Sequence, residues 1–453
     1  MDKWWDVGRW QVKGYRLEVI GKEYMARKNN INTLPHPLVA IELGGHSVRA
    51  MAAEMTEEGF LRVLGVESSS RYPNLVERGM VNNTSNASYV IGEILKLLAN
   101  RIRYEALSKV FVPLGGRSMQ IVAVTSKRSQ VYPKEVQQYL LDEMEQECRQ
   151  KIEGHNPQAA VLGLVLSYYK LDGQVLYEKP KAGQRAAQVE AYYIAFVGKK
   201  ELLKKVEDSF IRTPKHIEQT CVRADALLTA LAAPEDLENG CAILDMGAQT
   251  TTLSVFKGNQ YVYTKVVAQG GYDISRDIEQ LGTTLPYAER LKCQFGYASP
   301  EQVTADNAYR VPGSNPAESV VIRAKELAGV IAARLDQMLD GLMSDLEVFA
   351  DQIGVLYITG GASMLNGLEA YVQSKTRVQV MYGSHAPWLS MDTPDEMCAP
   401  CYASLVGTLL QGEQYRREHP DEQVEDDIIK RLKKLRKKVE EETLSIFTEL
   451  ENN

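Results

Sequence analysis

The sequence contains no uninterrupted apolar run of about 18 residues or more, the length that a membrane-spanning helix requires. Its N-terminus also lacks the basic segment followed by an apolar segment that is typical of a secretory signal. We therefore expect a cytoplasmic protein that reaches a membrane, where it does so, only as a peripheral component.

Basic residues are not in excess, because 52 lysines and arginines stand against 59 aspartates and glutamates and give a net charge of −7. This balance argues against a generic nucleic-acid binder. The six cysteines lack the spacing of a disulfide framework. Cys398 and Cys401 form a single CxxC pair, and since neither a second pair nor a nearby histidine follows, we expect free thiols rather than a zinc site.

What the sequence does have is the composition of a large globular protein. It has 453 residues, of which 44% are hydrophobic and 25% charged. This composition supplies a large core, and the length suggests two to four domains. Residues 1–37 carry three tryptophans among charges without clean periodicity. They fit a docking arm, a disordered extension, or a segment upstream of a start at Met25.

The first half opens on a run of short apolar segments. Segments 38–43, 47–52 and 61–66 predict strands, the first two joined by a glycine turn, which together indicate a meander. Apolar residues at helical spacing over 85–103 predict a helix, and 110–114 predicts a further strand that ends at Gly115 and Gly116.

Residues 117–198 have the character of a separate insert. They contain three predicted strands, a charged predicted helix at 133–151 between the first two, and a helix at 199–208 that leads back into the main body; the strands are 120–125, 160–171 and 188–197.

The opening pattern then recurs about 200 residues later. Segments 241–247, 251–256 and 260–268 repeat the order of apolar strand with an acid, small-residue turn and apolar strand, and 355–359 predicts a strand that ends at Gly360 and Gly361. Two similar halves imply a duplicated architecture with a cleft between them. Strands alternating with helices in both halves indicate α/β layers.

The two glycine turns are suited to hold phosphate. Glycine permits positive φ and a close approach of backbone amides, and a serine or threonine adds a hydroxyl donor. An acid precedes each turn and can hold a hydrated magnesium ion. Either turn alone would be read as an ordinary hairpin, but the pair at matched positions favours a phosphate clamp; its residues are Glu42, Gly44, Gly45, Ser47, Asp245, Gly247, Thr250 and Thr251.

Two further groups are candidates for the nucleoside half of such a site. Gly360 and Gly361 would let a flat base lie against the backbone, although a plain strand-to-helix turn has the same pattern. Glu289 and Lys292 lie three residues apart on one face of a predicted helix at 285–295, where they could bracket a ribose or form a surface ion pair.

These motifs resemble those of the actin-like ATPase superfamily, and within it the FtsA family of bacterial cell division proteins. Segments 38–47, 241–252 and 355–367 are similar to its two phosphate motifs and its adenosine motif. The resemblance covers about residues 38–412, and four further stretches are similar to FtsA: 77–82 (ERGMVN), 112–117 (VPLGGR), 269–278 (QGGYDISRDI) and 287–296 (YAERLKCQFG). The insert after Gly115 and Gly116 falls where FtsA carries its distinctive extra subdomain.

The resemblance implies an actin-like, ribonuclease H-like fold whose two lobes close over ATP and magnesium. Carried over position by position, the metal acids are Glu42 and Asp245, and the nucleotide contacts are Gly44, Gly45, Ser47, Gly247, Thr250, Thr251, Gly271, Glu289, Lys292, Gly360 and Gly361. It further implies self-assembly and binding of the tubulin homologue FtsZ through an outer subdomain at about 279–345. The implied divisions are an extension at 1–37, a first lobe at 38–116 and 199–235, the insert at 117–198, a second lobe at 236–412, and a linker with tail at 413–453.

The chain departs from the family at the site itself. Glu42 stands where aspartate is usual, and the second motif reads DMGAQTTT over 245–252 instead of DIGGGTTD. Gln249 therefore places a long side chain where backbone should approach phosphate, and Arg223 occupies a position that is usually glutamate. Because acids that position the attacking water are missing, we expect ATP binding to be retained or weakened and hydrolysis to be slow or absent.

The C-terminus is highly charged. Residues 411–427 predict a linker, and apolar residues at helical spacing from Ile428 onward predict an amphipathic helix with seven positive charges in nine residues. Such a helix can lie on an anionic membrane, as FtsA's last helix does, through Lys430, Arg431, Leu432, Lys433, Lys434, Leu435, Lys437 and Lys438. The acidic run 440–442 opposes this, and a short coiled coil fits the same pattern.

The resemblance to FtsA therefore implies a nucleotide-binding scaffold of the division site that links FtsZ to the cytoplasmic membrane. One alternative is the actin-like protein of pilus-assembly machines, which docks on the peptide of a membrane partner. Another, of a different class, is a sugar-kinase-like phosphotransferase, which would need a catalytic aspartate that no loop of this chain convincingly supplies.

Overall fold

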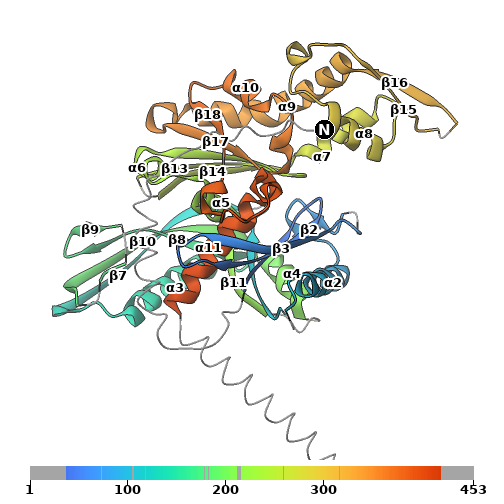
Figure 1. The fold of residues 1–453 in the computed structure, drawn as a ribbon. Helices are drawn as coiled ribbons and strands as arrows, with labels where there is room; N and C mark the ends of the chain where they lie inside the picture. The colour runs from blue at the N-terminus through green and yellow to red at the C-terminus, as the bar shows by residue number, and fades with distance from the viewer. Residues whose placement is uncertain are drawn as a thin grey trace, which may run out of the picture.

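The computed structural model of the chain describes residues 37–419 apart from 73, 105–106, 118, 178, 182, 212–215, 259 and 316. Two lobes lie one above the other in Figure 1, and a further sheet extends sideways beside the lower lobe. None of the helices in these ranges is long and apolar enough to cross a membrane. The predicted extension before Pro37 and the predicted tail helix lie outside the described residues.

The first lobe is built on a five-stranded sheet in the order β11-β6-β1-β2-β3. The meander β1-β2-β3 is antiparallel, whereas β6 pairs parallel with both β1 and β11. The elements of this lobe are β1 (Leu38–Leu43), β2 (Val48–Met55), β3 (Leu61–Ser69), β4 (Val76–Glu77), β5 (Met80–Val81), α2 (Thr84–Arg101), β6 (Lys109–Leu114), α4 (Lys200–Ile211) and β11 (His216–Val222). The sequence predicted all of the strands of the sheet except β11.

The second lobe is built on another five-stranded sheet, in the order β14-β13-β12-β17-β18. Helices and a small outer hairpin follow on its far side (Figure 1). The elements are β12 (Cys241–Met246), β13 (Thr251–Lys257), β14 (Gln260–Val267), α7 (Gly271–Glu279), α8 (Leu285–Phe295), β15 (Ala308–Pro312), β16 (Ser319–Arg323), α9 (Ala324–Glu347), β17 (Val355–Thr359), α10 (Leu368–Gln373) and β18 (Gln379–Tyr382).

The two sheets have the same topology. In each, an antiparallel meander of three strands continues through its first strand into two parallel strands, so that β3-β2-β1-β6-β11 corresponds to β14-β13-β12-β17-β18. Central strands such as β1 and β12 are buried along nearly their whole length, which explains their unbroken apolar sequences. The predicted duplication and the α/β class are confirmed.

The insert forms a four-stranded antiparallel sheet of its own, in the order β7-β10-β8-β9, with one helix packed on it. Its elements are β7 (Gln120–Glu135), α3 (Gln138–His155), β8 (Ala159–Leu171), β9 (Gln174–Leu176) and β10 (Arg185–Lys199). The prediction of a helix from 133 was wrong at its start. Residues 133–135 continue β7 because Glu135 and Lys134 pair with Arg185 and Ala186 of β10, and the helix begins at Gln138.

Two helices join the lobes. Helix α5 (Arg223–Leu231), followed by the short α6 (Pro234–Asn239), leads from the first lobe to the second, and α11 (Ala403–Glu418) returns from the second lobe to pack on α5, β1 and β6. The prediction of a linker from Gln411 was wrong, because α11 continues to Glu418. Tyr415 packs edge-on against Phe111 with ring centroids 6.4 Å apart, and Arg416 Nη2 lies 2.7 Å from Glu218 Oε2.

The crossing of α5 and α11 depends on one glycine. A Cβ atom on Gly407 would lie 1.8 Å from the backbone oxygen of Ala226, which is far inside van der Waals contact. The backbones of the two helices therefore approach more closely than any side chain would allow. Because this crossing carries α11 onto the first lobe, it helps to fix the lobes relative to one another.

We expect Gly407→Ala to destabilise the protein by about 1–3 kcal/mol or more, because the added methyl group overpacks the crossing. The matched control is Gly341→Ala in α9, where a Cβ atom would meet nothing within 4 Å. Alanine has the higher helix propensity, so this control should be neutral or stabilising by up to about 1 kcal/mol. Urea unfolding of both variants measures the difference, and equal stability of the two would show that the crossing is not tight.

Candidate functional site

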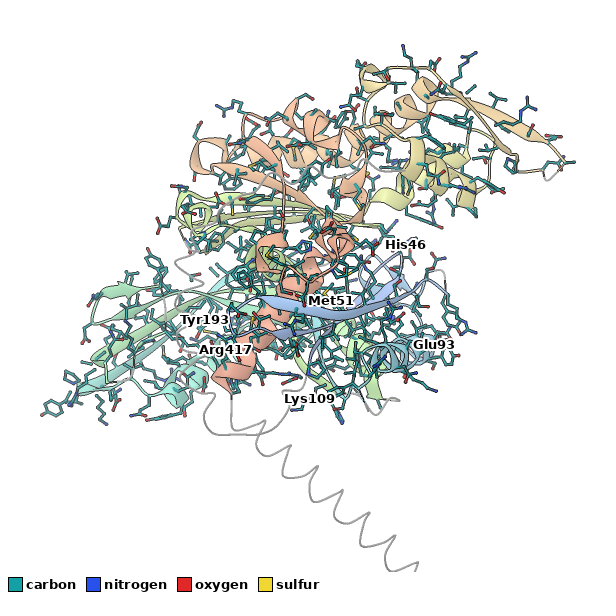
Figure 2. All side chains as sticks on the ribbon, viewed as in Figure 1. His46, Met51, Glu93, Lys109, Tyr193 and Arg417 are labelled. Carbon is teal, nitrogen blue, oxygen red and sulfur yellow. The ribbon has the colours of Figure 1, made fainter. Side chains whose placement is uncertain are left out.

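Two equivalent loops face each other across the space between the lobes. In the first lobe the loop 44–47 joins β1 to β2 and is closed by a hydrogen bond from Gly44 N to Ser47 O of 3.1 Å. In the second lobe the loop 247–250 joins β12 to β13 and is closed by the same bond, from Gly247 N to Thr250 O, of 2.9 Å. Figure 2 labels His46 in the first of these loops, where it lies toward the second lobe.

A cavity of about 460 Å³ opens between these loops and is lined by both lobes. Most of the residues that the sequence predicted for the nucleotide and the metal lie in its wall, namely Glu42, Gly44, Gly45, Ser47, Asp245, Gly247, Thr250, Gly271, Glu289, Lys292 and Gly361. The structure therefore brings together residues that are up to about 320 positions apart in the sequence.

Two predicted contacts do not line the cavity. Thr251 is fully buried, and its hydroxyl donates a hydrogen bond of 3.0 Å to the backbone oxygen of Gln269. Gly360 has a φ of +91°, and a Cβ atom there would lie 2.6 Å from Asp245 Oδ1, so this glycine lies behind the acid. The neighbouring Thr252 and Gly361 form part of the wall instead.

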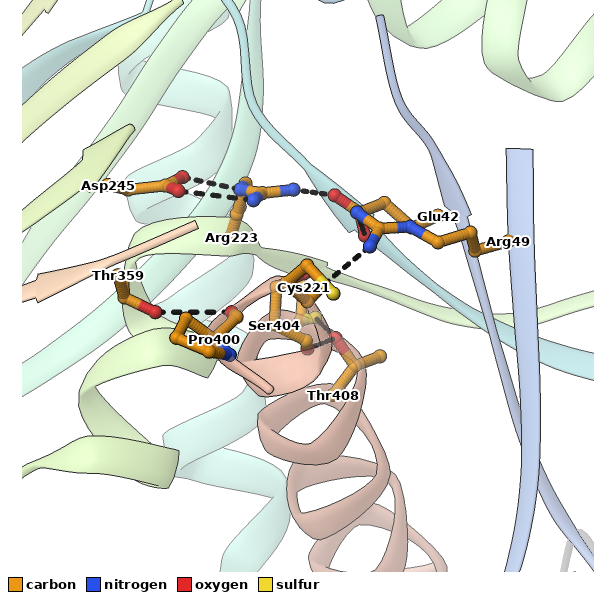
Figure 3. Close-up of polar contacts among 10 residues, drawn as sticks. Glu42, Arg49, Cys221, Arg223, Asp245, Thr359, Pro400, Ser404 and Thr408 are labelled. Carbon is orange, nitrogen blue, oxygen red and sulfur yellow. Dashed lines mark hydrogen bonds and ion pairs between the residues drawn. The ribbon is translucent and has the colours of Figure 1, made fainter. Parts of the chain in front are cut away.

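The centre of the cleft is an arginine between two acids. Arg223 Nε lies 2.6 Å from Asp245 Oδ2, and its Nη2 lies 3.2 Å from Oδ1. Its Nη1 forms an ion pair with Oε1 of Glu42 (Figure 3). The acids belong to β1 of one lobe and β12 of the other, so a single guanidinium connects the lobes.

Local structure explains why Arg223 reaches this place. It is the first residue of α5 and follows β11 directly, so the parallel strand delivers it to the carboxyl edge of the sheet. Gly115, directly after the neighbouring β6, lies beside it, and a Cβ atom there would meet Cβ and Cδ of Arg223 at 3.5 Å, an ordinary van der Waals contact.

A second arginine completes the charge balance. Arg49 is the direct cross-strand partner of Glu42 in the β1–β2 hairpin, and its Nη2 lies 3.1 Å from Glu42 Oε2. Its Nη1 also donates a hydrogen bond of 2.7 Å to the backbone oxygen of Cys401. Both acids are almost completely buried, with 4% and 9% of their side chains exposed, so the two arginines compensate two buried negative charges.

Gln249 occupies the gap between the two loops. Its Oε1 accepts a hydrogen bond of 2.8 Å from the backbone N–H of Arg78, and its Nε2 donates one of 3.3 Å to the backbone oxygen of Gly45. A Cβ atom on Gly45 would lie 2.9 Å from Gln249 Cδ, so the glutamine lies directly on the glycine that was predicted to approach phosphate.

The rim of the cleft brings together two of the stretches that carry the family resemblance. Arg78 and Gly79 both have positive φ, of 51° and 86°, and form the turn of the β4–β5 hairpin. A Cβ atom on Gly79 would lie 2.5 Å from the backbone oxygen of Gly115, so this turn presses against the end of β6. Only glycine permits that approach, which accounts for the paired glycines of the two stretches.

Glu289 and Lys292 form a polar cluster on the nucleoside side of the cleft. Lys292 Nζ lies 2.8 Å from Glu289 Oε2 and donates hydrogen bonds to Gly271 O at 2.7 Å and to Ser275 Oγ at 2.9 Å. Burial alone would raise the pKa of Glu289, but the Lys292 ammonium and the hydrogen bonds that the carboxylate accepts outweigh it and lower the pKa below its usual value.

The two acids predicted to hold magnesium have no carboxylate oxygen that is free of an arginine contact. Both oxygens of Glu42 and both of Asp245 are bonded to arginine. Within the described ranges, no three histidine, cysteine, aspartate or glutamate side chains are grouped so that they could hold a metal. The predicted membrane contacts between Lys430 and Lys438 lie outside the described residues.

Sequence reasoning identified Arg223 and Gln249 as departures but not as bonded groups, and it missed Arg49 and Arg78. A signal for Arg49 was present in the hairpin itself. A four-residue turn at 44–47 fixes the register, and this register places residue 49 directly opposite residue 42. Arg78 contributes its backbone N–H, and the identity of a side chain does not predict a backbone contact.

Replacing the glutamine that fills the gap should open the phosphate side. We expect Gln249→Gly to bind ATP about tenfold more tightly than the natural chain, a gain of about 1.4 kcal/mol, because the backbone of both loops becomes accessible. The variant should also lose about 1–2 kcal/mol of stability with its two cross-lobe hydrogen bonds. Isothermal titration with ATP measures the affinity.

The matched control is Gln249→Glu, which keeps the length of the side chain. It can still accept the Arg78 N–H but cannot donate to Gly45, and it adds a negative charge where phosphate would lie. We expect this variant to bind ATP no more tightly than the natural chain. Unchanged or weaker binding by Gln249→Gly would show that the glutamine does not obstruct the nucleotide.

Comparison with known proteins agrees with the geometry. The model of the family described as "Cell division protein FtsA" matches residues 242–407. The FtsA protein of Escherichia coli K12 is 23% identical over 397 residues, which cover 83% of this chain and 90% of that protein. The FtsA protein of Enterococcus faecalis is 22% identical over 340 residues, which cover 73% and 74% of the two chains.

Among solved structures, the "PilM-PilN type IV pilus biogenesis complex" contains a chain with the same fold, at a TM-score of 0.59 and 16% identity, and the match covers 83% of this chain and 99% of that one. Its resemblance identifies the architecture as the actin-like fold. The sequence matches to FtsA proteins support a role in cell division. The chain is therefore similar to the FtsA cell division proteins over most of its length and has the actin-like fold.

Proposed function

We propose that this chain is an actin-like scaffold of the bacterial division site, which assembles with itself and links an FtsZ polymer to the inner face of the cytoplasmic membrane. The observation that carries the proposal is the combination of the FtsA match with a separate sheet inserted directly after β6 of an actin-like lobe. The proposal assigns a structural role, in which turnover of a substrate is not required.

Within this role, ATP binds in the cleft as a ligand and does not need to be hydrolysed. The nucleoside half of the site, with Gly271, Lys292 and Gly361 in the wall, is compatible with a nucleotide. The phosphate half is narrowed by Gln249, so we expect weak binding. The acidic side chains in the described wall are Glu42, Asp245 and Glu289, and each is bonded to a cation, so no carboxylate of this wall is free to activate water. Turnover should therefore be slow or absent.

Two surfaces are suited to protein partners. The outer part of the second lobe, about 279–345, includes α8, the β15–β16 hairpin and most of α9, and we assign FtsZ binding to it. The insert carries large apolar side chains on its surface, since Val131, Tyr132 and Tyr139 are 87%, 74% and 65% exposed. An exposed apolar surface of this kind is typical of an interaction site, and we assign contacts between copies of the chain to it.

The rival functions receive less support. The likeness to the chain of the pilus complex shows the fold alone, whereas the family match and the curated relatives are FtsA proteins. A sugar-kinase-like enzyme needs a free carboxylate at the cleft to accept the proton of the attacking hydroxyl, and those in the described wall are all paired.

The link to division is tested with purified protein. We expect the full chain to co-sediment with FtsZ polymers formed in GTP, and a fluorescent fusion to concentrate at the division site of dividing cells. Monomeric FtsZ held in GDP is the control, because a linker of polymers should pellet only when polymers form. Absence of FtsZ binding, together with capture of the chain by a short cytoplasmic peptide of a pilus membrane protein, would favour the pilus-type role.

The membrane attachment is tested separately. We expect the full chain to co-sediment with vesicles containing anionic lipid and a chain truncated before Asp426 to remain in the supernatant, because the basic segment 430–438 is removed. Replacing Lys433, Lys434, Lys437 and Lys438 by glutamine should weaken pelleting in the same direction, and raised salt should weaken it further. Equal pelleting of the full and truncated chains would contradict membrane attachment through the tail.

A further inference from the structure

The cleft contains a pair of acids that would ordinarily be read as a metal site. Glu42 and Asp245 occupy corresponding positions at the ends of β1 and β12, before equivalent loops. Two ionised carboxylates that face each other from two lobes repel strongly in a buried site, and a cation between them removes that repulsion. In proteins that cation is commonly a divalent metal or a basic side chain.

In this chain the cation is a side chain. Arg223 bonds Asp245 with two nitrogens, Nε at 2.6 Å and Nη2 at 3.2 Å, and reaches Glu42 with the third. Figure 3 shows the guanidinium lying in line between the two acids, with Arg49 on the far side of Glu42. The fork geometry of arginine satisfies several carboxylate oxygens at once, which a lysine could not do.

The charges also balance without a further ion. The two acids contribute two negative charges, and Arg223 and Arg49 contribute two positive ones. A divalent cation would have to displace Arg223 from both acids, and would leave a guanidinium that is only 22% exposed without a partner. Removing one partner from such a buried arrangement carries a large penalty, so the arginine excludes the metal.

We propose that the guanidinium of Arg223 takes the place and the charge of a divalent cation in the cleft, so that the protein bridges its own lobes and binds ligands there independently of magnesium. Gln249 adds a second, uncharged bridge, from the second lobe to Gly45 and Arg78 of the first. This inference goes beyond the proposed role in division and does not depend on it.

The direct test measures metal binding by purified protein. Mn²⁺ replaces Mg²⁺ as the probe, because free Mn²⁺ is counted by its electron paramagnetic resonance signal. We expect the natural chain to bind no Mn²⁺ in excess of a surface background, and its unfolding midpoint to change by less than about 2 °C between Mg²⁺ and EDTA. Where ATP binds, its affinity should differ by less than about threefold between these conditions.

Arg223→Gln removes the charge and should convert the cleft into a metal site. We expect its unfolding midpoint to fall by about 5 °C or more in EDTA, because two buried carboxylates lose their partner. Mg²⁺ or Mn²⁺ should restore part of that loss, and the variant should bind about one Mn²⁺ more than the natural chain. Arg223→Lys keeps the charge without the fork, and should be destabilised but not restored by metal.

The matched control is Arg334→Gln. Arg334 of α9 forms a similar two-nitrogen pair with Asp277 of α7, at 2.5 and 2.7 Å and with 18% of its side chain exposed, away from the cleft. This variant should lose stability without gaining a response to metal. The control therefore distinguishes the effect of removing any partly buried arginine from the effect of removing Arg223, which replaces the cation.

Binding of Mn²⁺ in the cleft by the natural chain, or ATP binding more than about tenfold tighter with Mg²⁺ than in EDTA, would overturn the proposal. So would an Arg223→Gln variant that folds but ignores metal. Should that variant fail to fold, the measurements on the natural chain and on Arg223→Lys decide alone. None of these measurements involves FtsZ or membrane. A negative result here would therefore leave the proposed role in division unaffected, and a negative result in the FtsZ or membrane experiments would leave the arginine bridge unaffected.

Discussion

A single half-buried guanidinium between two buried carboxylates is the interaction on which the arrangement of this cleft depends. Arg223 contacts an acid from each lobe, and it is itself the first residue of the helix that connects them. Burying two acids is tolerable only when their charge is compensated and their oxygens are hydrogen-bonded. Because Arg223 and Arg49 fulfil both conditions, the distance between the lobes at this point is set by covalently attached groups and not by a diffusible ion.

The sheets, loops and helix crossing around this interaction form the frame of the molecule. This frame does not depend on the chemistry of the site. Two sheets of identical topology hold equivalent loops, and the tight crossing of α11 on α5 at Gly407 joins the lobes through backbone contact. None of these features requires a particular residue at 223 or 249. A frame stabilised by apolar strands and helix packing therefore accommodates an arginine at 223 and a glutamine at 249 in its cleft.

Much of this frame could be predicted from the sequence, because buried central strands leave an unbroken apolar signal and the glycine turns mark their ends. The repeat of that signal in segments 38–52 and 241–256 revealed the duplication. The misses have physical causes. β11 carries mixed residues because it lies at a sheet edge. The end of α11 gives no apolar signal because its residues after Gly412 are polar or aromatic and only half-buried or exposed. At the site, residue types indicated which groups lie near the cleft, but pairing between residues 42, 223 and 245 depends on long-range geometry that no local pattern contains.

The bridge also bears on how a scaffold of this kind is controlled. A ligand can shift a conformational equilibrium only by the difference in its affinity for the two states. When a nucleotide with its metal supplies most of the contacts between two lobes, the difference in its affinity for the two states is large. Assembly then depends on whether the nucleotide is bound. Here Arg223 and Gln249 make those contacts within the chain, so the difference that remains available to a nucleotide is small. In the proposed scaffold, a cleft bridged in this way would pass control of assembly to what binds the outer surfaces, such as other copies of the chain, a polymer or a membrane.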